Sequence, residues 1–250
     1  MGASVVRPFV LLLFCFFQVQ SVYATKINVA VAANFLVTME ELATQYEAES
    51  GIMLNISSAS SGKIYAQIMN GAPYDVFLSA DQIYTQKLIE NNKALRKSRF
   101  VYARGTLVLW SRSKKLIDQN TLLRDNFKYL SIANPKLAPY GAAAEEVMSA
   151  LGVKDALKRK IVKGESVGQA FQFVATGNAE YGFVAASQVL NTRNTMNRSD
   201  YWLVPSDLYT PILQEAVMLS RSSGDVAARD FMSFLQSSVA KAIIGKYGYQ

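Results

Sequence analysis

The chain has 250 residues, of which 50% are apolar, and 26 Lys and Arg against 19 Asp and Glu give it a net charge of +7. It contains no histidine, which excludes His-based catalytic triads, His general bases and His metal sites. The positive charges are scattered, which is more typical of solvated helix faces and loops than of a nucleic-acid surface, although a positive field also suits an anionic ligand. We therefore expect no nucleic-acid partner.

The first 24 residues have the features of a secretory signal peptide. Arg7 is their only charge, residues 9–17 form an apolar run, and Val22-Tyr23-Ala24 has the small-residue pattern of a signal-peptidase site. The run is too short to span a bilayer comfortably, which argues against a permanent membrane anchor. Cleavage after Ala24 would remove Cys15, the only cysteine, and leave a disulfide-free protein in the periplasm.

Strands and helices alternate over the next part of the chain. We expect buried strands at residues 27–33, 52–56 and 75–80. Helices should follow each of them: one from Phe35 that ends at Gly51, one over residues 63–70, and one that Asp81 caps and that runs to Glu90. This alternation predicts parallel strands in a doubly wound lobe.

A second α/β unit follows two extended runs, residues 100–103 and 106–110, which predict a crossing between lobes. Its expected strands are 129–132, 181–185 and 202–204, and its expected helices are one ending near 152, 155–160, 167–176 and 187–191. Residues 212–219 should return to the first lobe as a strand, before helices at 226–236 and 239–247. The predicted division is a signal peptide at 1–24, lobe I at 25–103 plus 206–250, and lobe II at 104–205.

Four expected helix starts carry small or polar residues, two in each lobe. They are Asn34, Ser60-Ser61-Gly62, Pro139-Tyr140-Gly141 and Glu165-Ser166. The first turn of a helix has unpaired backbone N–H groups, and each helix start stabilises an anion by roughly 0.3–1 kcal/mol. Any one of these residues alone is more typical of an ordinary cap, so spacing leaves both interpretations open. If the lobes face each other, the four starts would converge on one anion-binding cleft.

Neighbouring carboxylates are the remaining sign of catalysis. Glu40-Glu41, Glu145-Glu146 and the pair Asp75 and Asp81 look like helix faces or caps, and the chain has no GxSxG, HExxH, P-loop or GxGxxG motif. We therefore predict no enzyme, no catalytic residue and no cofactor. A secreted carboxylate-dependent enzyme stays as the less favoured alternative.

Several blocks resemble the periplasmic molybdate-binding proteins of ABC uptake systems. The most specific is residues 71–81, GAPYDVFLSAD, and residues 27–35, 59–63, 134–135, 139–141, 164–167 and 247–249 continue the match over essentially the whole mature chain. The resemblance implies a two-lobed type II periplasmic binding protein fold, α/β, with two doubly wound lobes that close at a hinge on a tetrahedral oxyanion. It also implies a receptor, expected to be a monomer, that binds molybdate and tungstate and delivers them to the membrane permease of an ABC importer.

The resemblance also implies the ligand-binding residues. They fall on Asn34, Ser61, Tyr140 and Val167, with Ala33 beside Asn34 as a further backbone donor. Many members of the family have Ser at the Asn34 position and some have Tyr at the Ala185 position, so we do not expect Ala185 to supply a ligand hydroxyl. No residue is expected to bind a metal cation directly, because molybdate is held as an oxyanion.

The expected roles differ between these residues. Ser61 should donate its hydroxyl and its N–H, and Tyr140 and Val167 should act through backbone N–H groups. The Asn34 side chain either caps its own helix or donates to the ligand, and Lys63 either attracts the anion at long range or is simply solvated; the sequence leaves both questions open. A site made of donors selects fully deprotonated anions. The alternative solutes are sulfate and ferric ion.

Overall fold

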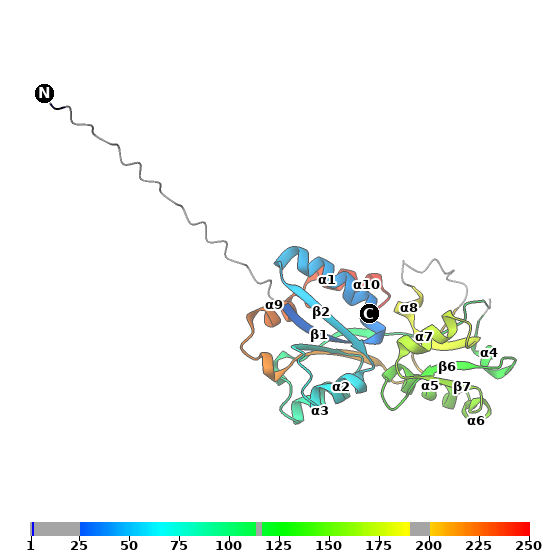
Figure 1. Cartoon of the computed structure of the whole chain (residues 1–250). Helices are drawn as coiled ribbons and strands as arrows, with labels where there is room; N and C mark the ends of the chain where they lie inside the picture. Colours follow the sequence, from blue (N-terminus) through cyan, green and yellow to red (C-terminus); the bar gives the residue numbers. More distant parts are fainter. Residues whose placement is uncertain (1, 3–25, 114–116, 191–200) are drawn as a thin grey trace.

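The computed structural model describes Gly2 and residues 26–113, 117–190 and 201–250. The predicted cleavage site at Ala24 and Cys15 lie outside these residues. The described chain forms two lobes, each built on a five-stranded sheet with helices on both faces (Figure 1). We call the lobe that contains β1 lobe I and the other lobe II. No helix among the described residues is long and apolar enough to span a membrane.

The sheet of lobe I has the strand order β2-β1-β3-β10-β4. The strand β1 runs parallel to β2 and β3, whereas β10 is antiparallel to β3 and β4. The sheet is therefore mixed, and the strand that returns from lobe II, β10, lies inside it rather than at its edge. The five strands are β1 (Lys26–Ala32), β2 (Met53–Ala59), β3 (Val76–Ser79), β4 (Phe100–Gly105) and β10 (Ile212–Met218).

Helices cover both faces of this sheet because its central strands are apolar on both sides. In β1, Ile27, Val29 and Val31 pack into one core and Ala30 into the other, as the alternation of side chains along a strand requires. One face carries α1 (Leu36–Ser50), α9 (Val226–Phe234) and α10 (Ser238–Lys246), and the opposite face carries α2 (Ser61–Met69) and α3 (Ile83–Glu90) (Figure 1). Short 3-10 turns are η1 (Ala33–Phe35), η2 (Arg96–Ser98) and η4 (Ser220–Ser222).

Lobe II repeats the arrangement with the strand order β7-β6-β8-β5-β9. Its core contains the fully buried Trp110, whose ring stacks on Phe171 with centroids 4.8 Å apart. The strands are β5 (Leu107–Trp110), β6 (Leu130–Ala133), β7 (Ile161–Gly164), β8 (Tyr181–Ala185) and β9 (Tyr201–Leu203). The helices are α4 (Gln119–Leu123), α5 (Pro139–Ala150), α6 (Lys154–Leu157), α7 (Val167–Ala175) and α8 (Ala186–Val189).

The lobes are joined where β4 ends at Gly105 and β5 begins at Leu107. The chain end is tied to this crossing: Arg104 N–H donates to the Gln250 carbonyl at 2.7 Å, and Gln250 N–H donates back to the Arg104 carbonyl at 3.2 Å. The C-terminus accordingly lies between the two lobes in Figure 1. Three backbone segments therefore meet at the junction. They are the crossing from β4 to β5, the start of β10 and the last residues of the chain.

Most predicted elements are present, and the two-lobed α/β fold predicted from the sequence is confirmed. Asp81 caps α3 as expected, because its carboxylate accepts hydrogen bonds from the N–H groups of Ile83 and Tyr84, both at 3.0 Å. Two elements of lobe II were not predicted, the strand β7 and the short helix α4. The helix expected from Phe35 begins one residue later, after the 3-10 turn η1. The residue boundaries of the two lobes stay a prediction.

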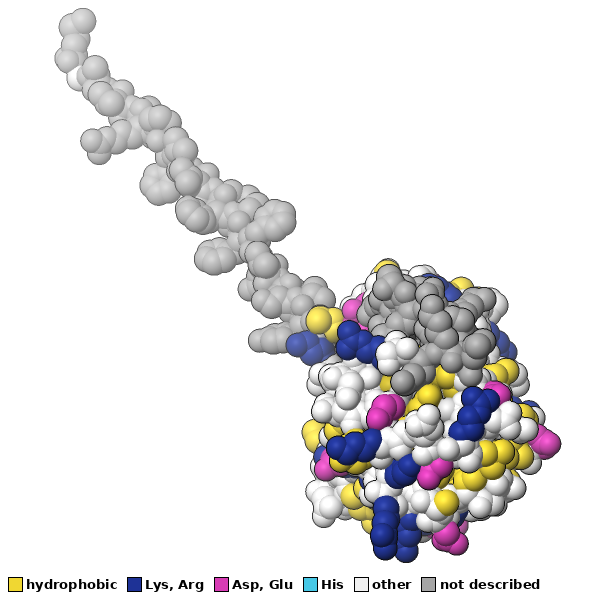
Figure 2. Space-filling model, turned by 90° about the vertical axis from the view of Figure 1, so that its right-hand side faces the viewer, with side chains coloured by type: hydrophobic (Ala, Val, Ile, Leu, Met, Phe, Trp, Pro, Cys, Tyr) yellow, Lys and Arg dark blue, Asp and Glu magenta, His cyan; other side chains and the backbone are white. Residues whose placement is uncertain are grey.

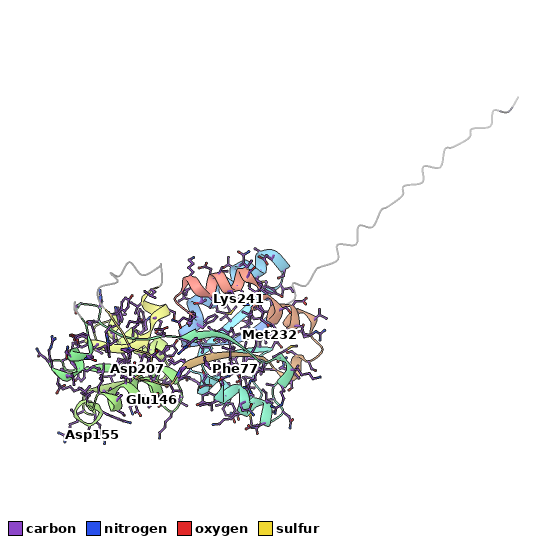
Figure 3. All side chains as sticks on the ribbon, turned by 180° about the vertical axis from the view of Figure 1, so that it is seen from behind. Phe77, Glu146, Asp155, Asp207, Met232 and Lys241 are labelled. Atoms are coloured by element: carbon purple, nitrogen blue, oxygen red, sulfur yellow. The ribbon has the colours of Figure 1, made fainter. Side chains whose placement is uncertain are left out.

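Charged side chains are spread over the surface. On the face of lobe II that Figure 2 shows, Lys and Arg are interspersed with Asp and Glu, and neither sign forms a continuous patch. Figure 3, from behind, shows Phe77 within lobe I and Glu146 and Asp155 on the helices of lobe II.

Gly141 offers a test of how closely α5 packs on its sheet. A Cβ at residue 141 would collide with the carbonyl oxygen of Ala133 and lie 2.7 Å from its carbonyl carbon, and neither backbone atom can move aside. We expect Gly141→Ala to lower the free energy of unfolding by about 1–3 kcal/mol. The control is Gly245→Ala on α10, where nothing lies within 4 Å. That change should be neutral or stabilise by up to about 1 kcal/mol. Urea unfolding of both variants decides, and equal effects would contradict the described contact.

Candidate functional site

A small cavity lies between the lobes. All five residues predicted from the sequence, Ala33, Asn34, Ser61, Tyr140 and Val167, line it. None of the described residues that line it carries a charge. The complete lining is Ala32, Ala33, Asn34, Ser60, Ser61 and Ala80 from lobe I, and Ala138, Pro139, Tyr140 and Val167 from lobe II.

The cavity lies where helices begin. Ser61 is the first residue of α2, Tyr140 the second residue of α5 and Val167 the first residue of α7. Backbone N–H groups in the first turn of a helix have no partner within the helix. Each of these helices follows a strand, and the carboxyl ends of parallel strands share one edge of a sheet. The topology of both lobes thus directs unpaired N–H groups toward the same space.

The lobes are closed around this space. Gly62 N–H, which belongs to α2, donates to the Leu137 carbonyl of lobe II at 2.9 Å. On another side of the cavity, a Cβ at Gly168 would lie only 3.3 Å from the Ala33 Cβ. The Tyr84 hydroxyl donates to the Lys136 carbonyl at 3.0 Å, which adds a third contact between the lobes.

Two serine hydroxyls line the cavity. Ser61 Oγ accepts a hydrogen bond from Ala80 N–H at 2.9 Å, so its own proton remains available to another acceptor. Ser60 Oγ is buried, with the residue 4% exposed, and has no hydrogen-bond partner in the described part of the chain. An unpaired buried hydroxyl costs about 1–3 kcal/mol, and this one belongs to a residue of the cavity lining. The sequence interpretation treated Ser60 only as part of a helix start; the doubled serine was the available signal.

The Asn34 side chain fulfils neither of its expected roles. It makes no capping bond, because neither η1 nor α1 has a side-chain cap at its start. Instead, Asn34 Nδ2 donates to Gln214 Oε1 at 2.8 Å and to the Tyr249 hydroxyl at 3.0 Å. Both amide hydrogens are thus used inside the protein. The donor that Asn34 can still offer to a ligand is its backbone N–H.

These contacts belong to a buried polar network beneath the cavity. Gln214 Nε2 donates to the Tyr140 hydroxyl at 3.2 Å, and the Tyr102 hydroxyl donates to Gln214 Oε1 at 3.0 Å. The Tyr249 hydroxyl lies 2.8 Å from the Asn34 carbonyl oxygen and 2.9 Å from the Ser187 hydroxyl of lobe II. The network therefore contains groups from both lobes.

Burial keeps the tyrosines of this network neutral. It raises the pKa of Tyr102 and of Tyr140 well above the ordinary value, and it raises the pKa of Tyr249 to about 12. The neighbouring tyrosine hydroxyls raise the pKa of Tyr102 and Tyr140 further, whereas the hydrogen bond from Gln214 opposes the rise at Tyr140. No negative charge from these residues faces the cavity at neutral pH.

Lys63 is neither a free cation nor simply solvated. Its ammonium forms an ion pair with the Glu165 carboxylate of lobe II at 3.0 Å. Both side chains are more than half exposed, at 52% and 72%, so the pair contributes at most about 1 kcal/mol to closure. Lys63 is not among the residues that line the cavity.

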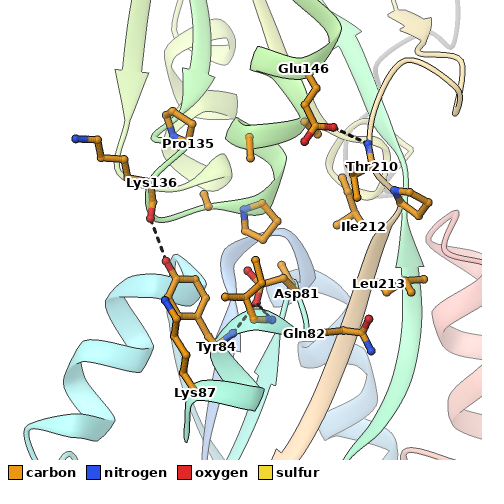
Figure 4. A pocket seen from close by; sticks show the side chains of 17 residues that line it. Asp81, Gln82, Tyr84, Lys87, Pro135, Lys136, Glu146, Thr210, Ile212 and Leu213 are labelled. Carbon is orange, nitrogen blue, oxygen red and sulfur yellow. Dashed lines mark hydrogen bonds between the residues drawn. The ribbon is translucent and has the colours of Figure 1, made fainter. Parts of the chain in front are cut away.

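A larger pocket adjoins the cavity, and both are lined by Ala80, Ala138 and Pro139 (Figure 4). Figure 4 shows Asp81 and Glu146 on its two sides, with Glu146 accepting a hydrogen bond from Thr210 N–H at 2.6 Å. Burial raises the pKa of Asp81, and the hydrogen bonds that its carboxylate accepts oppose this rise. The lining of this pocket thus carries two carboxylates and also two lysines, Lys87 and Lys136, whereas the described lining of the smaller cavity carries no charge. The described residues contain no group of three or more metal-binding side chains.

The chain is similar to known proteins over most of its length. The family model for bacterial extracellular solute-binding proteins matches residues 27–250. The molybdate-binding protein ModA of Azotobacter vinelandii is 47% identical over 228 residues, which cover 90% of this chain and 90% of that protein. ModA of Rhodobacter capsulatus is 44% identical, covering 90% of this chain and 88% of that protein.

A solved structure gives the same result. The periplasmic molybdate-binding protein of Azotobacter vinelandii matches with a TM-score of 0.86 and 42% sequence identity, over 90% of this chain and 98% of that one. The chain therefore belongs to the bacterial extracellular solute-binding proteins and, among them, to the family of the molybdate-binding proteins.

Proposed function

We propose that this protein captures molybdate, and tungstate as well, in the cavity between its lobes. It then delivers the anion to the membrane permease of an ABC importer. The observation that carries the proposal is an uncharged cavity at which helix starts from both lobes meet. The two relatives of 47% and 44% identity are named molybdate-binding proteins, which supports the choice of ligand.

The cavity residues would act as hydrogen-bond donors. Ser61 offers a hydroxyl and an N–H, Ser60 offers a hydroxyl, and Tyr140 and Val167 offer N–H groups. Asn34, with Ala33 beside it, adds backbone N–H groups. Each hydrogen bond to a charged acceptor contributes roughly 1.5–3 kcal/mol, so several of them offset the large desolvation cost of a dianion. No Lys or Arg needs to contact it.

Such a site distinguishes anions by their protonation. Hydrogen phosphate would place its O–H against donors, so it should be rejected, whereas molybdate, tungstate and sulfate carry only acceptors. Among these three, the size of the cavity must reject the smaller sulfate. Ferric ion would need phenolate or carboxylate ligands, and the raised pKa of Tyr140 opposes the formation of a phenolate.

The carboxylates considered for a secreted enzyme are engaged in ion pairs and hydrogen bonds within the protein. Glu145 forms an ion pair with Lys154 at 3.2 Å, and Asp75 forms one with Arg221 at 2.7 Å. Glu146 accepts the hydrogen bond from Thr210 N–H. The family to which the chain belongs consists of solute-binding proteins and not of enzymes.

The proposal includes the setting in which capture takes place. After removal of residues 1–24, the protein would act in the periplasm as a monomer. Its two lobes, 25–103 plus 206–250 and 104–205, would open and close at a hinge formed by the crossing segments. The bonds between lobes at Gly62 and Tyr84 then belong to the closed form.

The direct test is a ligand series measured by calorimetry and thermal shift. Molybdate and tungstate should bind and raise the melting temperature; at 100 times Kd the stabilisation is about 2.7 kcal/mol. Sulfate should bind weakly, and hydrogen phosphate and Fe(III) not at all. Ser61→Asp should abolish binding, because it places a buried carboxylate against the dianion. Stabilisation by Fe(III) but not by molybdate, or molybdate affinity retained in Ser61→Asp, would refute the assignment.

Ser60 provides a second prediction. Ser60→Ala removes a hydroxyl that has no partner in the described structure, so the empty protein should be as stable as the wild type or slightly more stable. Its affinity for molybdate should fall about 10–150-fold, the loss of one hydrogen bond to a charged acceptor. The matched control is Ser58→Ala, an exposed serine on β2, which should change neither quantity. An unchanged affinity in Ser60→Ala would remove Ser60 from the site.

The pH dependence follows from the donors. From about pH 6 to 9 none of them titrates, so affinity measured by calorimetry should be flat over the range in which the ligand itself stays a dianion.

The stability of the protein should depend on pH above about pH 10, where tyrosines titrate. The pKa of Tyr249 is about 12 in the folded protein and about 10 when unfolded.

The neutral phenol is therefore favoured by folding. Its contribution is fully present below about pH 10 and is lost as the pH rises through the folded pKa of about 12. For Tyr249 the loss is on the order of 2–3 kcal/mol. In urea unfolding between pH 9 and 12, Tyr249→Phe should lose less stability than the wild type. Parallel curves for the two proteins would contradict the raised pKa.

A further inference from the structure

We propose that Gln214 is a positioning residue for anion capture, which joins the two lobes beneath the closed cavity without touching the ligand. The inference rests on the proposed function and extends it to a residue that lines neither the cavity nor its entrance. Gln214 lies on β10 and is fully buried. It is absent from the cavity lining.

The Gln214 amide is shared between residues that line the cavity from opposite lobes. Its Oε1 accepts from Asn34 Nδ2 of lobe I at 2.8 Å, and its Nε2 donates to the Tyr140 hydroxyl of lobe II at 3.2 Å. Asn34 and Tyr140 are 106 positions apart in the sequence. A single side chain thus fixes the distance between the two walls of the cavity.

The chemistry of the site requires an amide. Oε1 faces two donors, Asn34 and Tyr102, while Nε2 faces the phenol oxygen of Tyr140. A carboxylate at this position would have no hydrogen to offer to Tyr140 and would bring a negative charge beneath the anion. A hydrocarbon would leave the three partner groups with fewer hydrogen bonds.

The backbone crossing packs directly against this bond. A Cβ at Gly105 would collide with the Tyr140 hydroxyl oxygen and would lie 2.7 Å from Gln214 Nε2. Gly105 is the last residue of β4, where the chain leaves lobe I. The bond between the lobes is thus formed at the junction itself, in a space that admits no side chain at residue 105.

A second connection meets the first at Asn34. The other hydrogen of the Asn34 amide goes to the Tyr249 hydroxyl, which lies 2.9 Å from the Ser187 hydroxyl of lobe II. Opening the lobes separates Asn34 from Tyr140 and Ser187, so it must break these links. Gln214 therefore favours the closed form, in which donors from both walls reach one anion, and its loss should mainly accelerate ligand release.

Two tyrosines that share Gln214 make a matched pair of tests. Tyr140→Phe removes the hydroxyl that bonds Gln214 across the lobes and keeps the backbone N–H at the cavity. Tyr102→Phe removes a hydroxyl that bonds the same amide within lobe I, on β4. Gln214→Met removes the amide but keeps the length of the side chain. We would measure molybdate affinity by calorimetry, the dissociation rate by stopped-flow fluorescence, and the thermal stability of the empty proteins.

The proposal predicts different results for the two tyrosines. Both changes should lower the melting temperature of the empty protein, but only Tyr140→Phe should weaken molybdate binding, by about 5–20-fold and through faster dissociation. Tyr102→Phe should stay within about twofold of the wild type. Gln214→Met should weaken binding about 10–100-fold, and the double variant with Tyr140→Phe should be no weaker than Gln214→Met alone.

Other results would overturn the proposal. Equal affinities in Tyr140→Phe and Tyr102→Phe would make Gln214 a purely structural residue. Additive losses in the double variant would mean that Tyr140 acts on the anion independently of Gln214. If the wild type binds no molybdate, the proposed function itself fails and this inference fails with it. If the wild type binds molybdate and the variants bind it with the same affinity, only the inference about Gln214 is refuted.

Discussion

A dianion can leave water only for a site that replaces its hydration with fixed hydrogen-bond donors. This requirement explains the arrangement of the protein. Helix starts follow the ends of parallel strands, so each sheet presents unpaired N–H groups at one edge. Two such edges, one in each lobe, meet at a cavity whose described lining has no charged side chain. In the proposed site the ligand would be surrounded from both sides, and closing of the lobes would complete the site.

In this proposal closure in turn depends on a neutral network behind the cavity, of which Asn34 and Tyr140 also line the cavity wall. The network of Asn34, Gln214, Tyr102, Tyr140 and Tyr249 is buried and carries no formal charge, because burial raises the pKa values of its tyrosines. A charged pair in the same place would act on the anion at short range in a medium of low dielectric constant. Neutral hydrogen bonds can fix the geometry without altering the field at the site. The ion pair between the lobes, Lys63 with Glu165, lies at the exposed surface instead.

The sequence predicted the two-lobed fold, the family and the five residues that line the cavity together with others. The fold follows from local signals such as apolar runs and helix caps, whereas the family and the five residues follow from motifs that resemble a known family. The role of the Asn34 side chain could not be predicted, because its partners lie 180 and 215 positions away and any polar residue before a helix resembles a cap. β7 was missed because it has four residues, and one of them, Lys163, is exposed. The orphan hydroxyl of Ser60 is a property of packing, which no local pattern records.

The position of β10 has a consequence for how the chain folds. In lobe I, residues 212–218 fill the place between β3 and β4, so this sheet stays in two pieces until nearly the whole chain has been made. The strands of lobe II all come from residues 107–203, a continuous stretch that needs no later partner for its sheet. Lobe II can therefore assemble first, while lobe I waits for β10 to join β3 and β4. Because long-range pairing slows folding, the exposed edges of β3 and β4 are the places where an incomplete chain is open to chaperones and to aggregation.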